Sequence, residues 1–222
     1  MLLAIDTSTS QMGLALYDGA QVLAESIWTS PQHHTTELAP AMTALLKRCH
    51  LRVDDLSAVG AAIGPGSFTA LRVGLAFAKG LALSRRLPLM GIPTLDVVAA
   101  AQPLAPLPLV AVLQAGRGRL AVGWYEAGPQ AWQPLSEPRV ETAESLARSI
   151  HNPTIVCGEL FAEERQRLAR KRVNIVLSTP ANSVRRPALL AELAWGRWQA
   201  GVVDDLGSLS PIYLHSSESV PA

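Results

Sequence analysis

The order of apolar segments along the chain repeats, and this repeat limits the folds that the sequence can adopt. In the first half, three short apolar runs follow one another closely, and Asp18-Gly19 between two of them is a strong hairpin signal. Helices and strands then alternate over residues 36–50, 57–63, 67–84, 87–90 and 94–102. After a proline-rich stretch, the second half predicts strands over residues 107–113, 122–125 and around Trp132. Its later helices and strands are predicted over residues 142–150, 154–157, 159–171, 173–177 and 187–200.

Each half therefore has the order β-β-β-α-β-α-β-α. Three meandering strands followed by strand–helix crossovers give a mixed five-stranded sheet flanked by helices. Two such halves predict an α/β protein of the actin-like (ASKHA) class, which is a duplicated ribonuclease-H-like fold with two lobes. We place the N-terminal lobe at residues 1–102 and the C-terminal lobe at residues 103–222. A chain of 222 residues can bury a core of this size without metals or disulfides.

Charge and hydropathy exclude several functions. Lysine and arginine number 19 against 18 acidic residues, and a net charge of +1 gives no whole-surface attraction for nucleic acid. Hydrophobic residues make up 49% of the chain, which excludes intrinsic disorder. The most apolar helical segment carries Arg72 and Lys79, which a membrane span tolerates poorly, and we see no targeting segment. We therefore expect a soluble, cytoplasmic protein without membrane contact.

Two loops that follow predicted strands have residues suited to phosphate. Hydroxyls and backbone N–H groups in the first loop could form an anion site, and the second leads into a helix start with free N–H groups. The residues are Asp6, Thr7 and Ser8 in the first loop and Gly64, Gly66 and Ser67 in the second. The spacing of a Walker loop is absent. Two interpretations stay open: the segments are either the phosphate loops of an actin-like protein or ordinary tight turns.

Residues for catalysis are few. His33, His34 and Glu37 have a spacing that could bind a metal, but no H-E-x-x-H helix is present, and a polar loop before a helix is the better interpretation. The sequence has no Cys-x-x-Cys pair and no G-x-S-x-G motif. We therefore assign no catalytic residue and no metal site.

The helix predicted over residues 67–84 is apolar nearly all round. Small residues recur every four positions on one face, where another helix can approach closely; they are Ala70, Gly74, Ala78 and Ala82. A helix of this kind is buried on more than one side. The preceding helix offers apolar cover through Leu38, Met42, Leu45 and Leu46. The two helices are either an internal pair or a docking surface for a protein partner.

A basic run near the end of the helix predicted over residues 159–171 is a candidate for RNA contact. Its members are Arg165, Arg167, Arg170, Lys171 and Arg172. Such a run can bind phosphates. It can also be a solvated helix end beside Glu163 and Glu164.

Four segments together resemble the bacterial TsaB family. They are Met1-Leu-Leu-Ala-Ile-Asp-Thr-Ser-Thr, His34-x-x-Glu37-Leu38, Gly64-Pro-Gly-Ser-Phe-Thr-Ala-Leu-Arg-Val-Gly74 and Pro211-Ile-Tyr-Leu214. The resemblance implies a two-lobed actin-like fold. It also implies a pseudoenzyme, a non-catalytic scaffold or activator of the catalytic paralogue TsaD. With TsaD and TsaE, such a subunit supports transfer of threonylcarbamoyl from threonylcarbamoyl-AMP to N6 of the adenosine 3′ of the anticodon, in tRNAs reading codons that start with A.

The resemblance further implies that two helices from each protein form the contact with TsaD. The implied interface residues are Glu37, Leu38, Met42, Leu45, Leu46, Leu71, Arg72, Leu75, Ala78, Lys79 and Ala82. On this assignment, a charge introduced at Leu75 or Ala78 breaks the contact and leaves the fold intact. The metal-binding histidines of TsaD correspond to Thr94 and Val98 here, neither of which can replace an imidazole.

The same resemblance implies a homodimer when the chain is alone, indirect contact with tRNA and no tightly bound cofactor. It leaves open weak binding of ATP or ADP at the boundary with TsaD. The alternative is an independent actin-like ATPase or kinase that uses Asp6 and the loop at residues 64–67.

Overall fold

A computed structural model describes residues 1–30, 33–171 and 173–214 of the chain. The chain divides into two compact units. The first comprises Met1–Val97 together with Arg185–Ile212, and the second comprises Val98–Val184 and the residues from Tyr213 onward.

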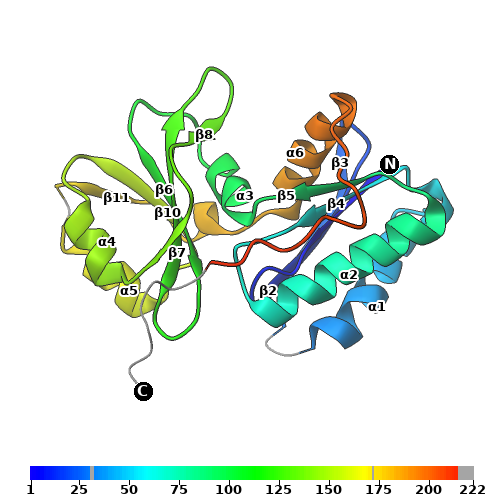
Figure 1. Cartoon of the computed structure of the whole chain (residues 1–222), viewed down its shortest axis with the longest axis horizontal. Helices are drawn as coiled ribbons and strands as arrows, with labels where there is room; N and C mark the ends of the chain where they lie inside the picture. Colours follow the sequence, from blue (N-terminus) through cyan, green and yellow to red (C-terminus); the bar gives the residue numbers. More distant parts are fainter. Residues whose placement is uncertain (31–32, 172, 215–222) are drawn as a thin grey trace. The chain divides into compact units, whose positions relative to one another are not determined.

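The first unit contains a mixed five-stranded sheet in the order β3-β2-β1-β4-β5 (Figure 1). Its strands are β1 (Leu2–Asp6), β2 (Gln11–Tyr17), β3 (Val22–Thr29), β4 (Ala58–Ala62) and β5 (Leu89–Ile92). The first three are antiparallel neighbours, and β4 and β5 continue the sheet in parallel with β1. The predicted hairpin forms at Asp18, whose Oδ1 accepts the N–H groups of Ala20 and Gln21 at 2.8 and 2.7 Å. These bonds confirm the hairpin and hold the pKa of Asp18 below its usual value.

Helices cover both faces of this sheet. Helices α1 (His34–Arg48) and α2 (Phe68–Arg85) lie on one face, and α6 (Pro187–Gln199) lies on the other (Figure 1). Alternate residues of β1 serve the two faces, because successive strand side chains point to opposite sides. Leu3 and Ile5 join the core under α1 and α2, whereas Leu2 and Ala4 join the core under α6.

The position of α6 differs from the sequence-based boundary, which assigned all of residues 103–222 to the C-terminal lobe. The buried face of α6, with Leu190 and Ala194, packs in the same cluster as Leu2 and Ala4. A Cβ at Gly60 would lie 2.6 Å from the Cβ of Ala194, so this glycine lets the helix approach β4 closely. The sheet is apolar on both faces and needs cover on both, and the final helix supplies the second layer.

The second unit contains a six-stranded sheet with the path β11-β10-β6-β7-β8, and β9 pairs with β7. Its strands are β6 (Leu109–Gln114), β7 (Leu120–Ala127), β8 (Trp132–Pro134), β9 (Arg139–Glu141), β10 (Thr154–Gly158) and β11 (Ile175–Leu177). Its helices are α4 (Ala143–Ser149) and α5 (Ala162–Ala169), and α3 (Thr94–Ala100) spans the boundary between the units. The mixed sheet flanked by helices occurs twice, which confirms the predicted fold class. Strand β9 was not predicted, because three residues carry too little alternation to be recognised.

Two single-turn 3₁₀ helices, Val53–Asp55 and Ala181–Ser183, complete the regular structure of the described residues. Among those residues, none of the helices combines the length and the apolar character that a membrane crossing requires.

A fragment that ends at residue 102 tests whether the first unit needs α6 to be complete. Without α6, the apolar sheet face that carries Leu2, Ala4 and Ala15 would be exposed to water. We expect this fragment to show no cooperative thermal unfolding by near-ultraviolet circular dichroism. As a control, residues 1–97 joined by a flexible linker to residues 185–214 should unfold cooperatively. Cooperative unfolding of the 1–102 fragment alone would contradict the assignment of α6 to the first unit.

Candidate functional site

The two loops that the sequence marked for phosphate lie against each other in the first unit. The N–H of Ser67 donates to the carbonyl of Ser8 at 2.7 Å. A Cβ at Gly66 would lie 2.2 Å from the same carbonyl oxygen, so only glycine fits this approach. The structure therefore brings the predicted residues together.

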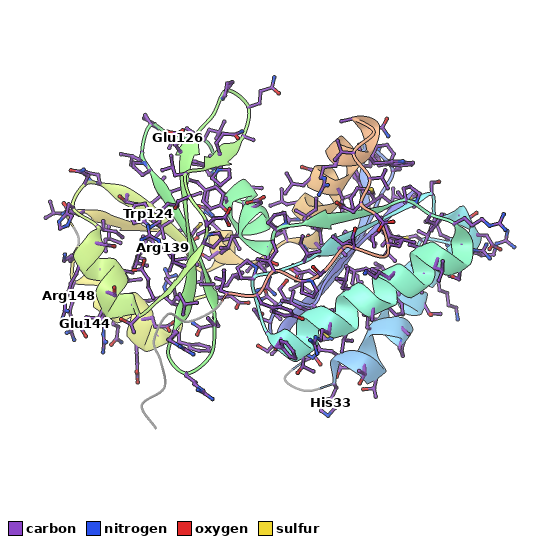
Figure 2. The ribbon with its side chains drawn as sticks, in the orientation of Figure 1. His33, Trp124, Glu126, Arg139, Glu144 and Arg148 are labelled. Atoms are coloured by element: carbon purple, nitrogen blue, oxygen red, sulfur yellow. The ribbon has the colours of Figure 1, made fainter. Side chains whose placement is uncertain are left out.

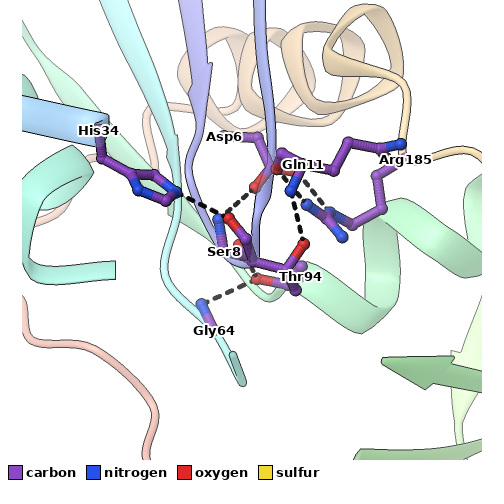
Figure 3. A network of polar contacts seen from close by, with 8 residues as sticks. Asp6, Ser8, Gln11, His34, Gly64, Thr94 and Arg185 are labelled. Atoms are coloured by element: carbon purple, nitrogen blue, oxygen red, sulfur yellow. Dashed lines mark hydrogen bonds and ion pairs between the residues drawn. The ribbon is translucent and has the colours of Figure 1, made fainter. Parts of the chain in front are cut away.

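The carboxylate of Asp6 is buried and fully engaged (Figure 3). Its Oδ2 accepts the Nε–H of Arg185 at 2.8 Å, and its Oδ1 accepts the N–H of Ser8 at 2.8 Å. Arg185 is only 2% exposed and donates a second bond to the carbonyl of Gln11 at 2.7 Å. A metal ion at Asp6 would have to displace this guanidinium. Sequence reasoning missed Arg185, because nothing in its local sequence distinguishes it from Arg186.

The other polar groups of the two loops bond mainly to one another. The Thr94 hydroxyl oxygen accepts the N–H of Gly64 at 2.9 Å and shares a hydrogen bond of 2.8 Å with the Ser8 hydroxyl (Figure 3). The Thr7 hydroxyl donates to the carbonyl of Ala70 at 2.7 Å. The Asp6 carboxylate, the hydroxyls of Thr7 and Ser8 and the N–H groups of Ser8, Gly64 and Ser67 are thus engaged within the protein, and this favours the tight-turn interpretation.

The docking-surface prediction needs a correction at most of its residues. Eight of the implied interface residues are buried in the chain's own core. They are Leu38, Met42, Leu45 and Leu46 in α1 and Leu71, Leu75, Ala78 and Ala82 in α2. These side chains offer no surface to a partner, because they pack against the sheet and between the two helices. A charge at Leu75 or Ala78 would therefore disrupt the core itself, and the expectation of an intact fold was wrong.

The opposite sides of α1 and α2 form an exposed surface with little charge, here called the helix-pair surface. Its exposed members are Thr35, Thr36, Ala39, Pro40, Thr43 and Ala44 from α1 and Phe68, Thr69, Arg72, Ala76, Gly80 and Leu83 from α2. Phe68 and Leu83 are 52% and 72% exposed, which is unusual for large apolar side chains. A groove is lined by Thr35, Phe68, Thr69, Arg72, Val73, Ala76 and Phe77. The sequence gives no separate signal for this surface, because α2 is small or apolar on nearly every side.

Three of the implied interface residues do reach solvent, namely Glu37, Arg72 and Lys79. Glu37 accepts the indole N–H of Trp28 at 2.8 Å, and this bond is the main reason that its pKa lies below the usual value. His33, labelled at the start of α1 in Figure 2, lies 3.8 Å from Glu37. The guanidinium of Arg72 lies 3.7 Å above the Phe68 ring, a cation–π geometry.

The basic run of the second unit is partly engaged in its own fold. Arg165 donates to the carbonyl of Ser178 at 2.7 Å, and Arg167 lies 3.7 Å from Glu144 of α4. Glu144 also pairs with Arg148 on the same helix (Figure 2). Arg170 and Lys171 follow α5, and Arg172 lies outside the described residues. Contact between this run and RNA stays a prediction.

Within the described part of the chain, no group of three or more His, Cys, Asp or Glu side chains lies close enough to hold a metal ion. At the two positions implied to correspond to metal ligands, Thr94 belongs to the loop network and Val98 is buried. Burial raises the pKa of the Cys157 thiol to about 12, so this cysteine is not a reactive thiolate.

Two mixed sheets with flanking helices, joined in one chain, define a protein of the duplicated actin-like class. The solved structure of YeaZ from Pseudomonas aeruginosa has a TM-score of 0.79 at 22% identity, covering 96% of this chain and 99% of that one. An activator of the 2-hydroxyisocaproyl-CoA dehydratase from Clostridium difficile has a TM-score of 0.52 at 10% identity, covering 90% and 96%. At these identities the likeness shows the fold alone.

The family model for TsaD, described as tRNA N6-adenosine threonylcarbamoyltransferase, matches residues 21–211. The chain belongs to this family. Curated relatives named "tRNA threonylcarbamoyladenosine biosynthesis protein TsaB" are similar to it. That of Bacillus subtilis is 35% identical over 125 residues, or 56% of this chain and 55% of the relative. That of Escherichia coli is 37% identical over 98 residues, or 44% and 42%. The chain spans about half the length of the curated relatives it matches, and the predicted resemblance to TsaB is confirmed.

Replacing Arg185 by alanine tests the role of the buried ion pair. The change leaves the Asp6 carboxylate buried without its charge partner, so we expect a loss of about 3–5 kcal/mol in the free energy of unfolding, measured with urea. Adding Asp6→Asn should recover part of this loss, because the uncompensated charge is then absent.

The neighbouring Arg186→Ala is the matched control. Arg186 pairs with Glu25 at the surface and is 53% exposed, so its loss should cost about 1 kcal/mol or less. Equal effects of the two substitutions would contradict a special role for Arg185.

Proposed function

We propose that this chain is a non-catalytic subunit in tRNA threonylcarbamoyladenosine biosynthesis, which docks on a TsaD-type catalytic paralogue and activates it. The complex, with TsaE, transfers threonylcarbamoyl from threonylcarbamoyl-AMP to N6 of the adenosine 3′ of the anticodon. The names of the curated relatives and membership of the TsaD family support this role.

The helix-pair surface is the observation that carries the proposal. Exposed apolar residues on a soluble protein can mark interaction sites. Helix α2 exposes Phe68 and Leu83, and α1 exposes Ala39, Pro40 and Ala44. A paralogue built on the same fold presents two equivalent helices. We therefore propose a bundle with two helices from each protein, centred here on Thr69, Ala76 and Gly80.

The closed loops support the non-catalytic part of the proposal. A phosphate-transferring enzyme of this fold class needs an available acid and free backbone N–H groups where the first unit holds Asp6 and residues 64–67. Here Arg185 neutralises that acid, and the N–H groups of Ser8, Gly64 and Ser67 are all bonded within the protein. The chain thus keeps the two loops as parts of its own packing.

The second candidate function is that of an independent actin-like ATPase or kinase. Only the contact between the same two loops favours it. Isothermal titration calorimetry of the isolated chain with ATP and magnesium separates the two. We expect neither tight binding of ATP nor its hydrolysis, because Arg185 already occupies the Asp6 carboxylate. Turnover by the isolated chain would overturn the non-catalytic assignment.

Reconstitution tests the proposed role directly. Purified TsaD-type paralogue, TsaE, the donor-forming enzyme and tRNA should form the modified nucleoside efficiently only when this chain is added. Equal modification with and without the chain would refute the activator role.

A bulky, uncharged side chain introduced on the helix-pair surface should block docking. Gly80 lies in the C-terminal half of α2 and has open space around the position of a Cβ, so Gly80→Trp should leave the fold intact. If a partner helix lies on this surface, the indole will weaken binding to the TsaD-type paralogue by about tenfold or more, measured by calorimetry.

Gly196→Trp is the matched control for this test. Gly196 is also exposed, also within a helix and also without neighbouring atoms, but it lies in α6 on the other face of the sheet. Binding should be unchanged in this variant. Equal loss of affinity in both variants, or in neither, would contradict the assigned surface.

A further inference from the structure

One stretch of this nearly neutral chain is strongly cationic. Residues 165–191 contain seven basic side chains and no acidic one. Two of the seven, Arg185 and Arg186, belong to the first unit and pair there with Asp6 and Glu25. The other five form the basic run of the second unit, and the question is what balances their charge.

The two helices beside this run carry opposite charges at their two ends. Strands β9, β10 and β11 are all parallel to β6, and α4 and α5 connect them in turn, so the two helices run in the same direction. Their first turns hold Glu144, Glu163 and Glu164, and their last turns hold Arg148 and Arg167. This order complements the helix dipoles, so by itself it does not indicate a ligand.

The cations at the C-terminal ends outnumber the carboxylates that reach them. Glu144 lies close to both Arg148 and Arg167, so one carboxylate serves two guanidinium groups, which remain 75% and 53% exposed. Arg170 and Lys171 follow α5, and the structure records no ion pair for either of them among the residues that it describes. This end of the two helices therefore has an excess of positive charge.

The turn after α5 is fixed by the fold and projects into solvent. The carbonyl of Lys171 accepts the N–H groups of Asn174 at 3.0 Å and Ile175 at 2.9 Å, and the carbonyl of Asn174 accepts the N–H of Thr154 in β10 at 2.9 Å. Val173 of the same turn is 88% exposed. A large partner can therefore reach these cations, and the backbone that carries them needs no ordering on binding.

We infer that Arg148, Arg167, Arg170 and Lys171, here called the cationic end, bind the phosphodiester backbone of RNA. The choice of RNA over an acidic protein rests on the function proposed above, in which the complex acts on tRNA. Direct contact goes beyond the indirect contact with tRNA that the resemblance to TsaB implies. A net charge of +1 does not oppose it, because the cationic end acts locally.

The chemistry of the cationic end defines what it does for the reaction. Guanidinium and ammonium groups bind phosphate oxygens through charge-assisted hydrogen bonds. Contacts to the backbone fix the position of a nucleic acid and carry no sequence information directly. The cationic end therefore holds tRNA for the catalytic paralogue and takes no part in choosing the base that is modified.

Salt dependence of RNA binding tests the inference on the chain alone. Fluorescence anisotropy with a labelled, unmodified tRNA transcript should give a dissociation constant of about 10 µM or lower at about 50 mM sodium chloride. Arg170→Gln with Lys171→Gln should weaken this binding by about fivefold or more. The slope of log K against log salt concentration should become shallower by about 1.4–1.8, because each phosphate contact contributes about 0.7–0.9.

Lys47→Gln with Arg48→Gln is the matched control. These two residues are also adjacent cations in the last turn of a helix and also exposed, but they lie on α1 in the first unit. The control removes the same charge from the chain, so RNA affinity and salt slope should stay unchanged. Equal flattening of the slope in both variants would contradict the assigned surface. Circular dichroism checks that both variants are folded.

Steady-state kinetics of the reconstituted complex provide the second arm. Arg170→Gln with Lys171→Gln should raise the KM for tRNA by about fivefold or more and leave kcat unchanged, because the lost contacts hold the tRNA equally in the ground state and the transition state. The affinity of this variant for the TsaD-type paralogue, measured by calorimetry, should equal that of the unmodified chain.

The outcomes separate this inference from the proposed function. No binding of tRNA by the chain at about 50 mM salt, or equal binding by the Arg170 and Lys171 variant, would overturn the inference and leave the docking role standing. Weaker binding of that variant to the paralogue, with RNA binding unchanged, would assign the cationic end to an acidic protein and also overturn it. Absence of binding between the unmodified chain and the paralogue would refute the docking role, and the anisotropy measurement would still decide the RNA contact.

Discussion

The buried ion pair between Asp6 and Arg185 joins two parts of the chain that are 179 residues apart and so completes the first unit. Burying two opposite charges is unfavourable unless their other bonds are also satisfied, and Ser8 and Gln11 satisfy them here. The next residue, Arg186, pairs with Glu25 of β3, and Glu25 also accepts the N–H of Ala188 in the first turn of α6. These polar contacts fix the start of the helix that covers the second face of the sheet.

The same ion pair bears on function. In this fold class, the turn after the first strand and the glycine-rich loop are the parts of a lobe that can face a phosphate. In this chain the acid of the turn is bound by an arginine, and Gly66 brings the second loop onto the carbonyl of Ser8. The two loops thus contribute to the packing of the first unit. The chemically unusual part of the unit is instead the outer side of α1 and α2, where Phe68 and Leu83 are exposed to water.

The sequence predicted features that depend on local periodicity. These include the element order, the mixed five-stranded sheet of the first unit and the Asp18 turn. Features decided by long-range packing were not predictable. Leu75 is buried and the adjacent Ala76 is exposed, yet α2 is apolar on every side and its sequence gives no indication of which side faces the sheet. Arg185 and Arg186 are neighbours of the same type, and one is buried because its carboxylate partner lies in the core. Element order likewise does not reveal which sheet a terminal helix covers.

Net charge illustrates why a whole-chain quantity can mislead about binding. A net charge of +1 argues against general attraction to polyanions, and that argument still applies to the protein as a whole. However, charges at a surface act over a screening length of about 8 Å at physiological ionic strength, which is much shorter than a protein domain. A partner docked on α1 and α2 would therefore respond to the charges of those two helices more than to the acidic excess elsewhere in the chain. Composition therefore becomes informative about binding only when it is counted over the elements that form one surface.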